Sequence, residues 1–433
     1  MKQPMRILLD HGGYGLANAG DTAMIEVAAR RLVNDDRVDR VQVLTNAMSL
    51  FAEFKMPGEP LNHEGKRLLL GQWNTMGPLR SARNLFGSAV RDRGADIEDR
   101  FRRSFQAVSV PMMRARILGR KQHTSHFNKF LRTVNESDAL CIAGGGYLND
   151  SFLTHALSVL ELAQWFIRQG KPVAMFGQGI GPVTNPRLRK KLAEVLPHCA
   201  VIGLREGIVG PQILRELNIT GDHVAVTGDD AIDLVLDTAY QQGEVPKDSI
   251  GVNIRMAEYS GLNPQEGSQI FEALAEVAVE KGLGIQPVPI SWHAGERDID
   301  SVSSAIQIDS DRLLALQNPQ HPQTVMQVVA RCATVFTGSY HAAVFALSQG
   351  IPVIALSTSE YYSTKFAGLS QQFGHIGMTI VSPHEVSTAA DMRSMIGQSI
   401  ESTSDVAPQL RKHAWEQAEK SKALYARFVS DIE

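Results

Sequence analysis

Cysteine and long hydrophobic runs are both scarce in this chain of 433 residues. The three cysteines, Cys141, Cys199 and Cys332, match no metal-binding spacing, so we expect small core residues in a reducing compartment. No apolar run is long enough to cross a bilayer, and no signal-peptide core follows the first methionine. These absences predict a cytoplasmic protein that has no disulfide framework.

Two nucleotide-binding motifs are also missing. The glycine-rich loop at residues 10–21 has neither the G-x-G-x-x-G spacing of dinucleotide-binding folds nor the Gly-Lys-Ser/Thr of a Walker loop. The net charge is −3, and the hydrophobic and charged contents of 43% and 21% are ordinary for a globular protein. This charge gives no reason to expect nucleic acid as a partner.

Short β-branched strands alternate with amphipathic helices along most of the chain, which is typical of parallel α/β sheets. A polar stretch, Q-Q-G-E-V-P-K-D, interrupts the series near residues 241–248. We therefore predict an α/β fold of two doubly wound, Rossmann-like domains that face each other across a cleft. The expected bounds are 1–243 and 244–407, followed by a terminal helix at 408–433 that packs back on a domain.

The alternation weakens between residues 55 and 132, where sixteen Lys and Arg residues stand against six Asp and Glu residues. One interpretation is a positive surface that attracts an anionic glycan, a lipid-linked sugar phosphate or a membrane. The other is a solvated, basic helical insertion in the first domain. Aromatic residues there are few and do not alternate with the charges, which disfavours single-stranded nucleic acid.

The most informative stretch is residues 334–365, which contains T-V-F-T-G-S-Y-H-A-A-V-F-A-L-S-Q-G-I-P-V-I-A-L. It predicts a buried strand, a turn, a helix that Ser339 caps, a second strand, and a loop that carries Lys365. His341 then lies in the first turn of a helix at the carboxyl end of a parallel strand, where open α/β sheets bind ligands. A helix N-terminus attracts an anion, and an imidazole can transfer protons near neutral pH. The alternative is a half-buried histidine that only caps the helix.

Polar and glycine residues follow several other expected strands, each in a turn. Asn18 and Asp21 suit sugar hydroxyls, or alternatively bond within the loop and cap a helix. Arg205 suits a phosphate or a carboxylate, or alternatively pairs with Glu206 on the surface. The candidate catalytic residues are His341 and Arg205. The candidate residues for substrate binding are Asn18, Asp21, Gly145, Gly146, Gln178, Asp229, Arg255, His293, Ser339, Tyr340 and Lys365. The acids Glu296, Asp298 and Asp300 are expected in a solvated loop, with a metal site as the alternative.

Seven motifs occur in a fixed order: G-L-A-N-A-G-D-T-A, C-I-A-G-G-G-Y-L-N-D, F-G-Q-G-I-G-P, G-L-R-E-G, V-T-G-D-D-A, G-S-Y-H-A-A-V-F and Y-Y-S-T-K. As an ordered set they resemble the polysaccharide pyruvyl transferase family. The resemblance implies a fold like that of two-domain glycosyltransferases of the B type (GT-B). It also implies transfer of the enolpyruvyl group of phosphoenolpyruvate to a sugar of an exopolysaccharide or cell-wall glycan precursor, which forms a pyruvate ketal and releases phosphate.

The resemblance also implies roles for individual residues. His341 falls on the family's general acid or base, and Arg205 on an arginine that binds the donor anion. The family often has Arg-Leu-His where this chain has Ser339-Tyr340-His341. Either Arg255, Lys365 or the helix N-terminus replaces the missing arginine, or the donor differs. Glu206 stands where an aspartate is common.

The partners that follow are phosphoenolpyruvate as co-substrate and a glycan or lipid-linked sugar as acceptor, with no further cofactor, metal or nucleic acid. Peripheral membrane association through the basic stretch and a homo-oligomer stay open. Two other functions also stay open: a nucleotide-sugar glycosyltransferase on the same fold, and a non-catalytic glycan-binding homologue.

Overall fold

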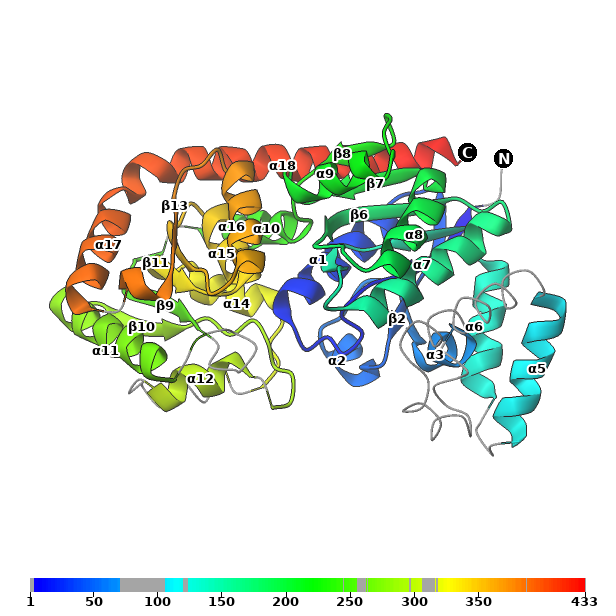
Figure 1. Ribbon diagram of the computed structural model, residues 1–433, viewed down its shortest axis with the longest axis horizontal. Coiled ribbons are helices and arrows are strands. Elements are labelled where there is room, and N and C mark those ends of the chain that lie inside the picture. The colour runs from blue at the N-terminus through cyan, green and yellow to red at the C-terminus, as the bar shows by residue number, and fades with distance from the viewer. Residues whose placement is uncertain are drawn as a thin grey trace.

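The computed structural model describes residues 4–70, 106–119, 124–243, 245–254, 262, 264–295, 297–305, 316, 318–386 and 388–432. These residues form two lobes that lie side by side along the long axis of the molecule (Figure 1). Each lobe is a parallel sheet with helices packed against it, as the alternating pattern of the sequence predicts. None of the helices in this part of the chain combines the length and hydrophobicity needed to cross a membrane.

The first lobe contains an eight-stranded sheet with the order β3-β2-β1-β4-β6-β7-β8, in which β5 also pairs with β6. Its strands are β1 (Met5–Asp10), β2 (Val38–Thr45), β3 (Glu59–Asn62), β4 (Ala139–Ile142), β5 (Gly145–Leu148), β6 (Val173–Ile180), β7 (Val201–Leu204) and β8 (Val224–Val226). Its helices are α1 (Ala19–Val33), α2 (Met48–Glu53), α3 (Glu64–Leu70), α5 (Gln106–Gly119), α6 (Ser125–Glu136), α7 (Leu153–Arg168), α8 (Pro186–Val195) and α9 (Val209–Glu216). The next helix, α10 (Ala231–Gln242), lies where the lobes meet, and its apolar side chains share a hydrophobic cluster with helices of the second lobe (Figure 1). A short 3-10 turn at Leu196–His198 follows α8.

The second lobe contains a five-stranded sheet with the order β10-β9-β11-β12-β13. Its strands are β9 (Ser249–Asn253), β10 (Gly284–Pro287), β11 (Cys332–Thr337), β12 (Val353–Leu356) and β13 (Met378–Val381). Its helices are α11 (Pro264–Glu280), α12 (Asp298–Ala305), α14 (Pro322–Val329), α15 (Tyr340–Ser348), α16 (Glu360–Gln372), α17 (Ala389–Glu401) and α18 (Thr403–Asp431), with a 3-10 turn at Pro383–Val386.

The central strands are covered on both faces, and their composition explains why. Every residue of β4, β6, β9, β11 and β12 is buried. A parallel strand that is buried on both faces needs nearly continuous small and apolar residues, and Ala-Leu-Cys-Ile in β4 supplies them. The three cysteines are free and buried.

Four details of the sequence interpretation change. The strand β6 runs to Ile180, so Gln178 lies inside a strand and not in the turn after it. Gly145 and Gly146 lie in the extra strand β5, which pairs with β6. Residues 59–62 form the edge strand β3, so the basic insertion expected at 55–132 begins later than its composition suggests. Lys365 lies on α16, because the helix begins already at Glu360 and not after the expected loop.

The two lobes touch through main-chain atoms beside the start of α1. Asn18 forms an isolated antiparallel bridge with Ser291 from the loop after β10. The N–H of Ala19 donates to the carbonyl of Ile290 at 2.8 Å, and the N–H of Trp292 donates to the carbonyl of Ala17 at 2.8 Å. These bonds fix the loop that precedes α1 against the second lobe.

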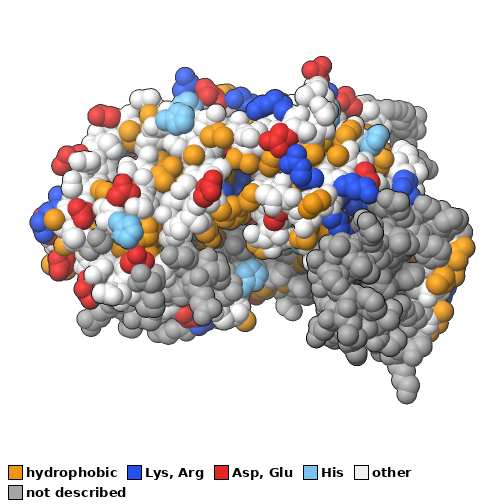
Figure 2. Space-filling view, viewed as in Figure 1, with side chains coloured by type: hydrophobic (Ala, Val, Ile, Leu, Met, Phe, Trp, Pro, Cys, Tyr) orange, Lys and Arg blue, Asp and Glu red, His pale blue; other side chains and the backbone are white. Residues whose placement is uncertain are grey.

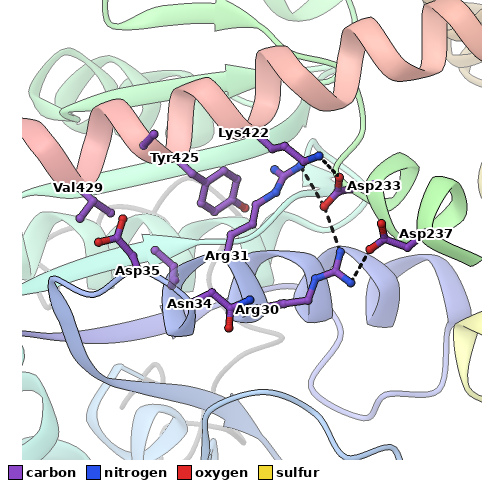
Figure 3. Close-up of a pocket in the computed structure, with 11 residues that line it drawn as sticks. Arg30, Arg31, Asn34, Asp35, Asp233, Asp237, Lys422, Tyr425 and Val429 are labelled. Carbon is purple, nitrogen blue, oxygen red and sulfur yellow. Dashed lines mark hydrogen bonds and ion pairs between the residues drawn. The ribbon is translucent and has the colours of Figure 1, made fainter.

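The last helix, α18, starts on the second lobe and runs across to the first (Figure 1). The ring of Tyr425 stacks on Phe176 of β6 with 3.6 Å between ring centroids, and its hydroxyl donates to Asp230 at 2.8 Å. A pocket of about 470 Å³ opens between α1, α10 and α18 (Figure 3). Several of its charged side chains are paired with one another: Arg30 with Asp233 and Asp237, and Lys422 with Asp233.

Candidate functional site

His341 lies at the boundary between the lobes. It occupies the second position of α15, which follows the buried strand β11, and the residue is 8% exposed. The ring packs against the backbone of Gly20 in α1 of the first lobe. A methyl group at Gly20 would lie 2.0 Å from Cγ of His341, so the imidazole occupies space that only a glycine leaves free.

Asp229 of the first lobe faces this imidazole. Its Oδ2 lies 3.7 Å from Nε2 of His341, and neither atom has a hydrogen-bond partner within the described part of the chain. Its other oxygen accepts from the N–H of Ala231 at 3.0 Å, which fixes the carboxyl. Burial raises the pKa of Asp229, but His341 and Arg205 together lower it further, so the group stays ionised. From this position the buried carboxylate can orient the imidazole.

Arg205 follows β7 and is 4% exposed. Its guanidinium lies along the glycine backbone of β5 and β6, since a Cβ on Gly179 would meet Nε at 2.6 Å and a Cβ on Gly146 would meet Nη2 at 2.8 Å. The Tyr340 ring of the second lobe lies under the guanidinium, 4.1 Å from Cζ to the centroid. Among the described residues its nearest acid is Asp229 at 3.8 Å, which is longer than a hydrogen bond. The buried cation therefore keeps donors for a further anion.

Lys365 contributes a second cation at the same place. It is half-buried, and the position of a Cβ on Gly146 would be 3.5 Å from its Nζ. Its ammonium lies 4.1 Å from the ring centroid of Tyr361. Burial, followed by the charge of Arg205, lowers the pKa of Lys365 to about 7, although Asp21 opposes this shift.

The N-terminus of α15 adds uncharged donors. The N–H groups of Tyr340, His341 and Ala342 have no acceptor within their helix, because they belong to its first turn. Ser339 takes the cap position, but its side chain forms no capping bond, contrary to the expectation from the sequence. The N–H of Ser339 itself donates to Oγ1 of Thr337 at 2.8 Å. Because no side chain caps the first turn, the start of the helix stays open to an anion.

Asp21 and His293 complete the surroundings of His341. Burial raises the pKa of the Asp21 carboxyl, and the charges of His341, Arg205 and His293 oppose that rise. The carboxylate is therefore within electrostatic reach of all three. His293 is exposed. Asn18 instead caps α1, because its Oδ1 accepts from the N–H groups of Gly20 and Asp21 at 3.0 and 3.1 Å.

Some of the candidate residues do not lie beside His341, Arg205 and Lys365. Gln178 is fully buried, and its amide nitrogen donates to the carbonyls of Ile142, Ala143 and Phe176, so it braces the sheet. Arg255 lies outside the described residues. Gly145 pairs with Gln178 and leaves room for the ring of Tyr147, since a Cβ there would lie 2.5 Å from that ring.

Two acids considered in the sequence analysis, Glu206 and Asp298, form hydrogen bonds within the fold. Glu206 does not pair with Arg205; its carboxylate accepts from the N–H groups of Ile208, Val209 and Gly210 at the start of α9. Asp298 is 1% exposed and accepts from Asn253 and from the N–H groups of Ile290 and Ser291, so it is no solvated loop residue. Glu296 lies outside the described residues. The described residues hold no cluster of His, Cys, Asp and Glu arranged for a metal ion.

Three site residues escaped the sequence interpretation although they lie within the quoted motifs. Gly20 and Gly179 make room for His341 and Arg205, respectively. Asn149 of the first lobe donates to the hydroxyl of Tyr361 in the second lobe at 3.3 Å. Their signal was the cluster of glycine and amide residues after a strand, but only the packing of the lobes shows which partner each one meets.

Solved structures with the same architecture include an epimerase and a glycotransferase. The UDP-GlcNAc 2-epimerase of Neisseria meningitidis, solved with UDP-GlcNAc bound, is similar with a TM-score of 0.55 and 12% identity over 99% of this chain and 99% of that chain. The glycotransferase of kitacinnamycin is similar with a TM-score of 0.53 and 11% identity over 100% of both chains. At this identity the likeness shows the fold alone, two Rossmann-like domains of the GT-B type.

The sequence itself matches the family model of polysaccharide pyruvyl transferases over residues 74–360. That match covers more than half of the chain and includes Arg205, Asp229 and His341. The resemblance drawn from the ordered motifs is thereby confirmed. The chain belongs to the polysaccharide pyruvyl transferase family.

Proposed function

We propose that the protein transfers a pyruvyl group from phosphoenolpyruvate to a sugar of a glycan or a lipid-linked glycan precursor, and forms a pyruvate ketal. One observation carries the proposal. Arg205 from the first lobe and Lys365 from the second border the same glycine, Gly146, beside the imidazole of His341 and with no acid in hydrogen-bond contact among the described residues. Two cations held together in this way need an anion to offset their repulsion.

The donor suits this arrangement because it carries both a phosphate and a carboxylate. A guanidinium binds either group through two parallel hydrogen bonds, and an ammonium adds a point charge. The open first turn of α15 offers N–H groups to the second anionic group. Lys365 and this helix start are the described groups that take over from the arginine that Ser339 replaces.

The proton transfers that the reaction needs also suit the residues of the site. One acceptor hydroxyl adds to C2 of the enolpyruvyl group while C3 takes up a proton and becomes the methyl group. The C2–O bond to phosphate then breaks, the second hydroxyl closes the ketal, and its proton leaves with the phosphate. His341, oriented by Asp229, delivers the proton to C3, and Asp21 is within electrostatic reach to accept one from a hydroxyl.

Phosphate release tests the proposal. The purified protein is incubated with phosphoenolpyruvate and a panel of soluble glycosides, and we expect phosphate release that depends on a glycoside. His341→Ala should lower the rate by roughly 10²–10⁴-fold, the usual contribution of a general acid or base. His198→Ala, at an exposed histidine of the first lobe, is the matched control and should retain the rate.

Other outcomes identify the alternatives. Turnover of a nucleotide sugar without turnover of phosphoenolpyruvate indicates a glycosyltransferase, and glycan binding without turnover of either donor indicates a binding protein. Ser339→Arg restores the family's common residue. A large gain in affinity for phosphoenolpyruvate in this variant would argue that the native donor is a different molecule.

A further inference from the structure

The helix α5 exposes an apolar stripe to solvent. Its residues Val108, Met112 and Leu118 are 50%, 49% and 58% exposed, and they are three of the nine large hydrophobic side chains that the described chain exposes. Residues 108, 112 and 118 lie on one face of a helix with 3.6 residues per turn, and the exposed Ala115 and Pro111 fall between them. One short helix thus carries a third of the exposed large apolar side chains of the described residues.

The opposite face of α5 holds the helix on the first lobe. Ser109 and Met113 are 2% and 5% exposed, and Met113 belongs to the same hydrophobic cluster as Leu69 and Leu70 of α3. Figure 1 shows α5 as the outermost helix of the first lobe, on the side away from the second lobe. Hydrophobic side chains reach the edge of the molecule in this region (Figure 2). The stripe is therefore displayed outward by a helix that is itself anchored.

Charge indicates what covers the stripe. The exposed Arg114 lies one helical turn from both Pro111 and Leu118, so it borders the apolar face. The sequence around α5 is basic, with sixteen Lys and Arg residues against six acids at 55–132 in a chain whose net charge is −3. An apolar helical face bordered by an exposed arginine, within a stretch of basic sequence, is suited to the interface of an anionic bilayer, where the apolar side chains enter the acyl boundary and the cations face the headgroups.

We propose that α5 docks the protein on an anionic membrane surface, with Val108, Met112 and Leu118 inserted. This inference does not depend on the reaction that the site between the lobes performs. Full-length protein is sedimented with vesicles of phosphatidylcholine, alone or mixed with an equal amount of phosphatidylglycerol. We expect binding to the mixed vesicles that weakens as salt is added, because the basic part of the attraction is screened.

The decisive variant is Val108→Ser/Met112→Ser/Leu118→Ser. It should lower the partition coefficient by at least about tenfold, given the apolar area that three such side chains withdraw from water. The matched control is Tyr240→Ser/Val279→Ser/Trp415→Ser, which removes apolar side chains that are 92%, 83% and 59% exposed on other helices. The control should bind like the wild type, and phosphate release with a soluble glycoside should stay unchanged in both variants.

Three results would overturn the inference. The wild type fails to sediment with anionic vesicles, or the α5 variant binds as well as the wild type. The third is a wild type that is dimeric in analytical ultracentrifugation and an α5 variant that is monomeric, without any difference in vesicle binding. That result would assign the stripe to a second copy of the chain.

Discussion

The imidazole of His341 depends on a residue that has no side chain. The ring of His341 occupies the space that a Cβ at position 20 would need. At this point the two lobes meet through the imidazole of His341 and the backbone of Gly20. In the same way, the guanidinium of Arg205 occupies space that side chains at Gly146 and Gly179 would need. In this site the glycines set the positions of the charged groups.

Replacing Gly20 by alanine should therefore impair the reaction without unfolding the protein. The new methyl group displaces the imidazole by more than 1 Å, and a misplacement of this size costs up to about 10²-fold in rate. Turnover of phosphoenolpyruvate with a glycoside measures the effect, and a thermal melt confirms the fold. Gly15→Ala is the control, because the nearest atom to its Cβ would be 3.8 Å away. Equal rates in both variants would contradict the placement of His341.

Lys365 should make donor binding sensitive to pH. Its pKa lies at about 7, so the ammonium that we propose as a donor-binding group is present below this pH and is lost above it. Affinity for phosphoenolpyruvate should therefore fall as pH rises from about 7, by up to roughly tenfold per pH unit. Calorimetric titrations over this range provide the measurement. Lys365→Arg stays charged throughout and should bind with a much flatter pH profile; an equally steep profile would assign the titration to another group.

Sequence patterns singled out most of the residues that meet in this candidate site, but not their contacts. Arg205, Asp229, His341 and Lys365 were all named from the turns after strands, because the carboxyl ends of parallel strands converge. The role of Gln178 was not visible, since its amide bonds to carbonyls that lie 36, 35 and 2 residues away. A position in a motif fixes neither the direction of a side chain nor its partner on another element.

At the scale of elements, a buried ion pair joins α3 to the end of β1. Nζ of Lys66 lies 2.5 Å from Oδ2 of Asp10, and both side chains are fully buried. The ammonium also donates to the hydroxyl of Tyr14 at 2.7 Å, and that hydroxyl donates to Oδ1 of Asp10 at 2.7 Å. Burial raises the pKa of Asp10, but the pairing with Lys66 lowers it further, so the carboxylate is ionised. The triad holds the loop that leads from β1 to Asn18 and Asp21.

Removing the ammonium should be costly because a charged carboxylate stays buried. Lys66→Met is expected to destabilise the fold by about 3–5 kcal/mol, measured by urea unfolding. Adding Asp10→Asn removes the stranded charge and should recover about half of this loss. Lys129→Met, at an exposed lysine of α6, should change the stability by less than about 0.5 kcal/mol. A small effect of Lys66→Met alone would show that the pair is hydrated in solution.

Element boundaries were predictable where composition is unambiguous. Apolar strands such as β4 and β11 and the helices α7 and α15 follow from their apolar composition and length. The strand β3 did not, because Glu-Pro-Leu-Asn has weak strand propensity and owes its conformation to pairing with β2. The start of α16 was hidden for a similar reason, since Glu-Tyr-Tyr-Ser-Thr contains few strong helix formers.

At the scale of the whole molecule, α18 joins the two lobes. Leu410 and Ala414 near its start belong to the hydrophobic cluster that contains α15 of the second lobe. Tyr425, Phe428 and Val429 near its end belong to the cluster beneath the first sheet. The sequence predicted a terminal helix that packs back on a domain, but its apolar positions alone did not reveal that it covers both.

The far half of α18 should therefore contribute to stability as a core element does, although it is the end of the chain. Phe428 is fully buried and contacts the ring of Phe176 edge to face, with centroids 6.0 Å apart. Phe428→Ala should cost about 3–5 kcal/mol in a thermal or urea melt, the usual loss for a buried aromatic side chain. Trp415→Ala on the same helix removes a larger ring that is 59% exposed and should cost no more than about 0.5 kcal/mol. If both variants melt like the wild type, α18 rests on the first lobe without stabilising it, and the lobes are held together by their other contacts, among them the hydrophobic cluster that α1 shares with α14 and α15 and the main-chain bonds beside α1.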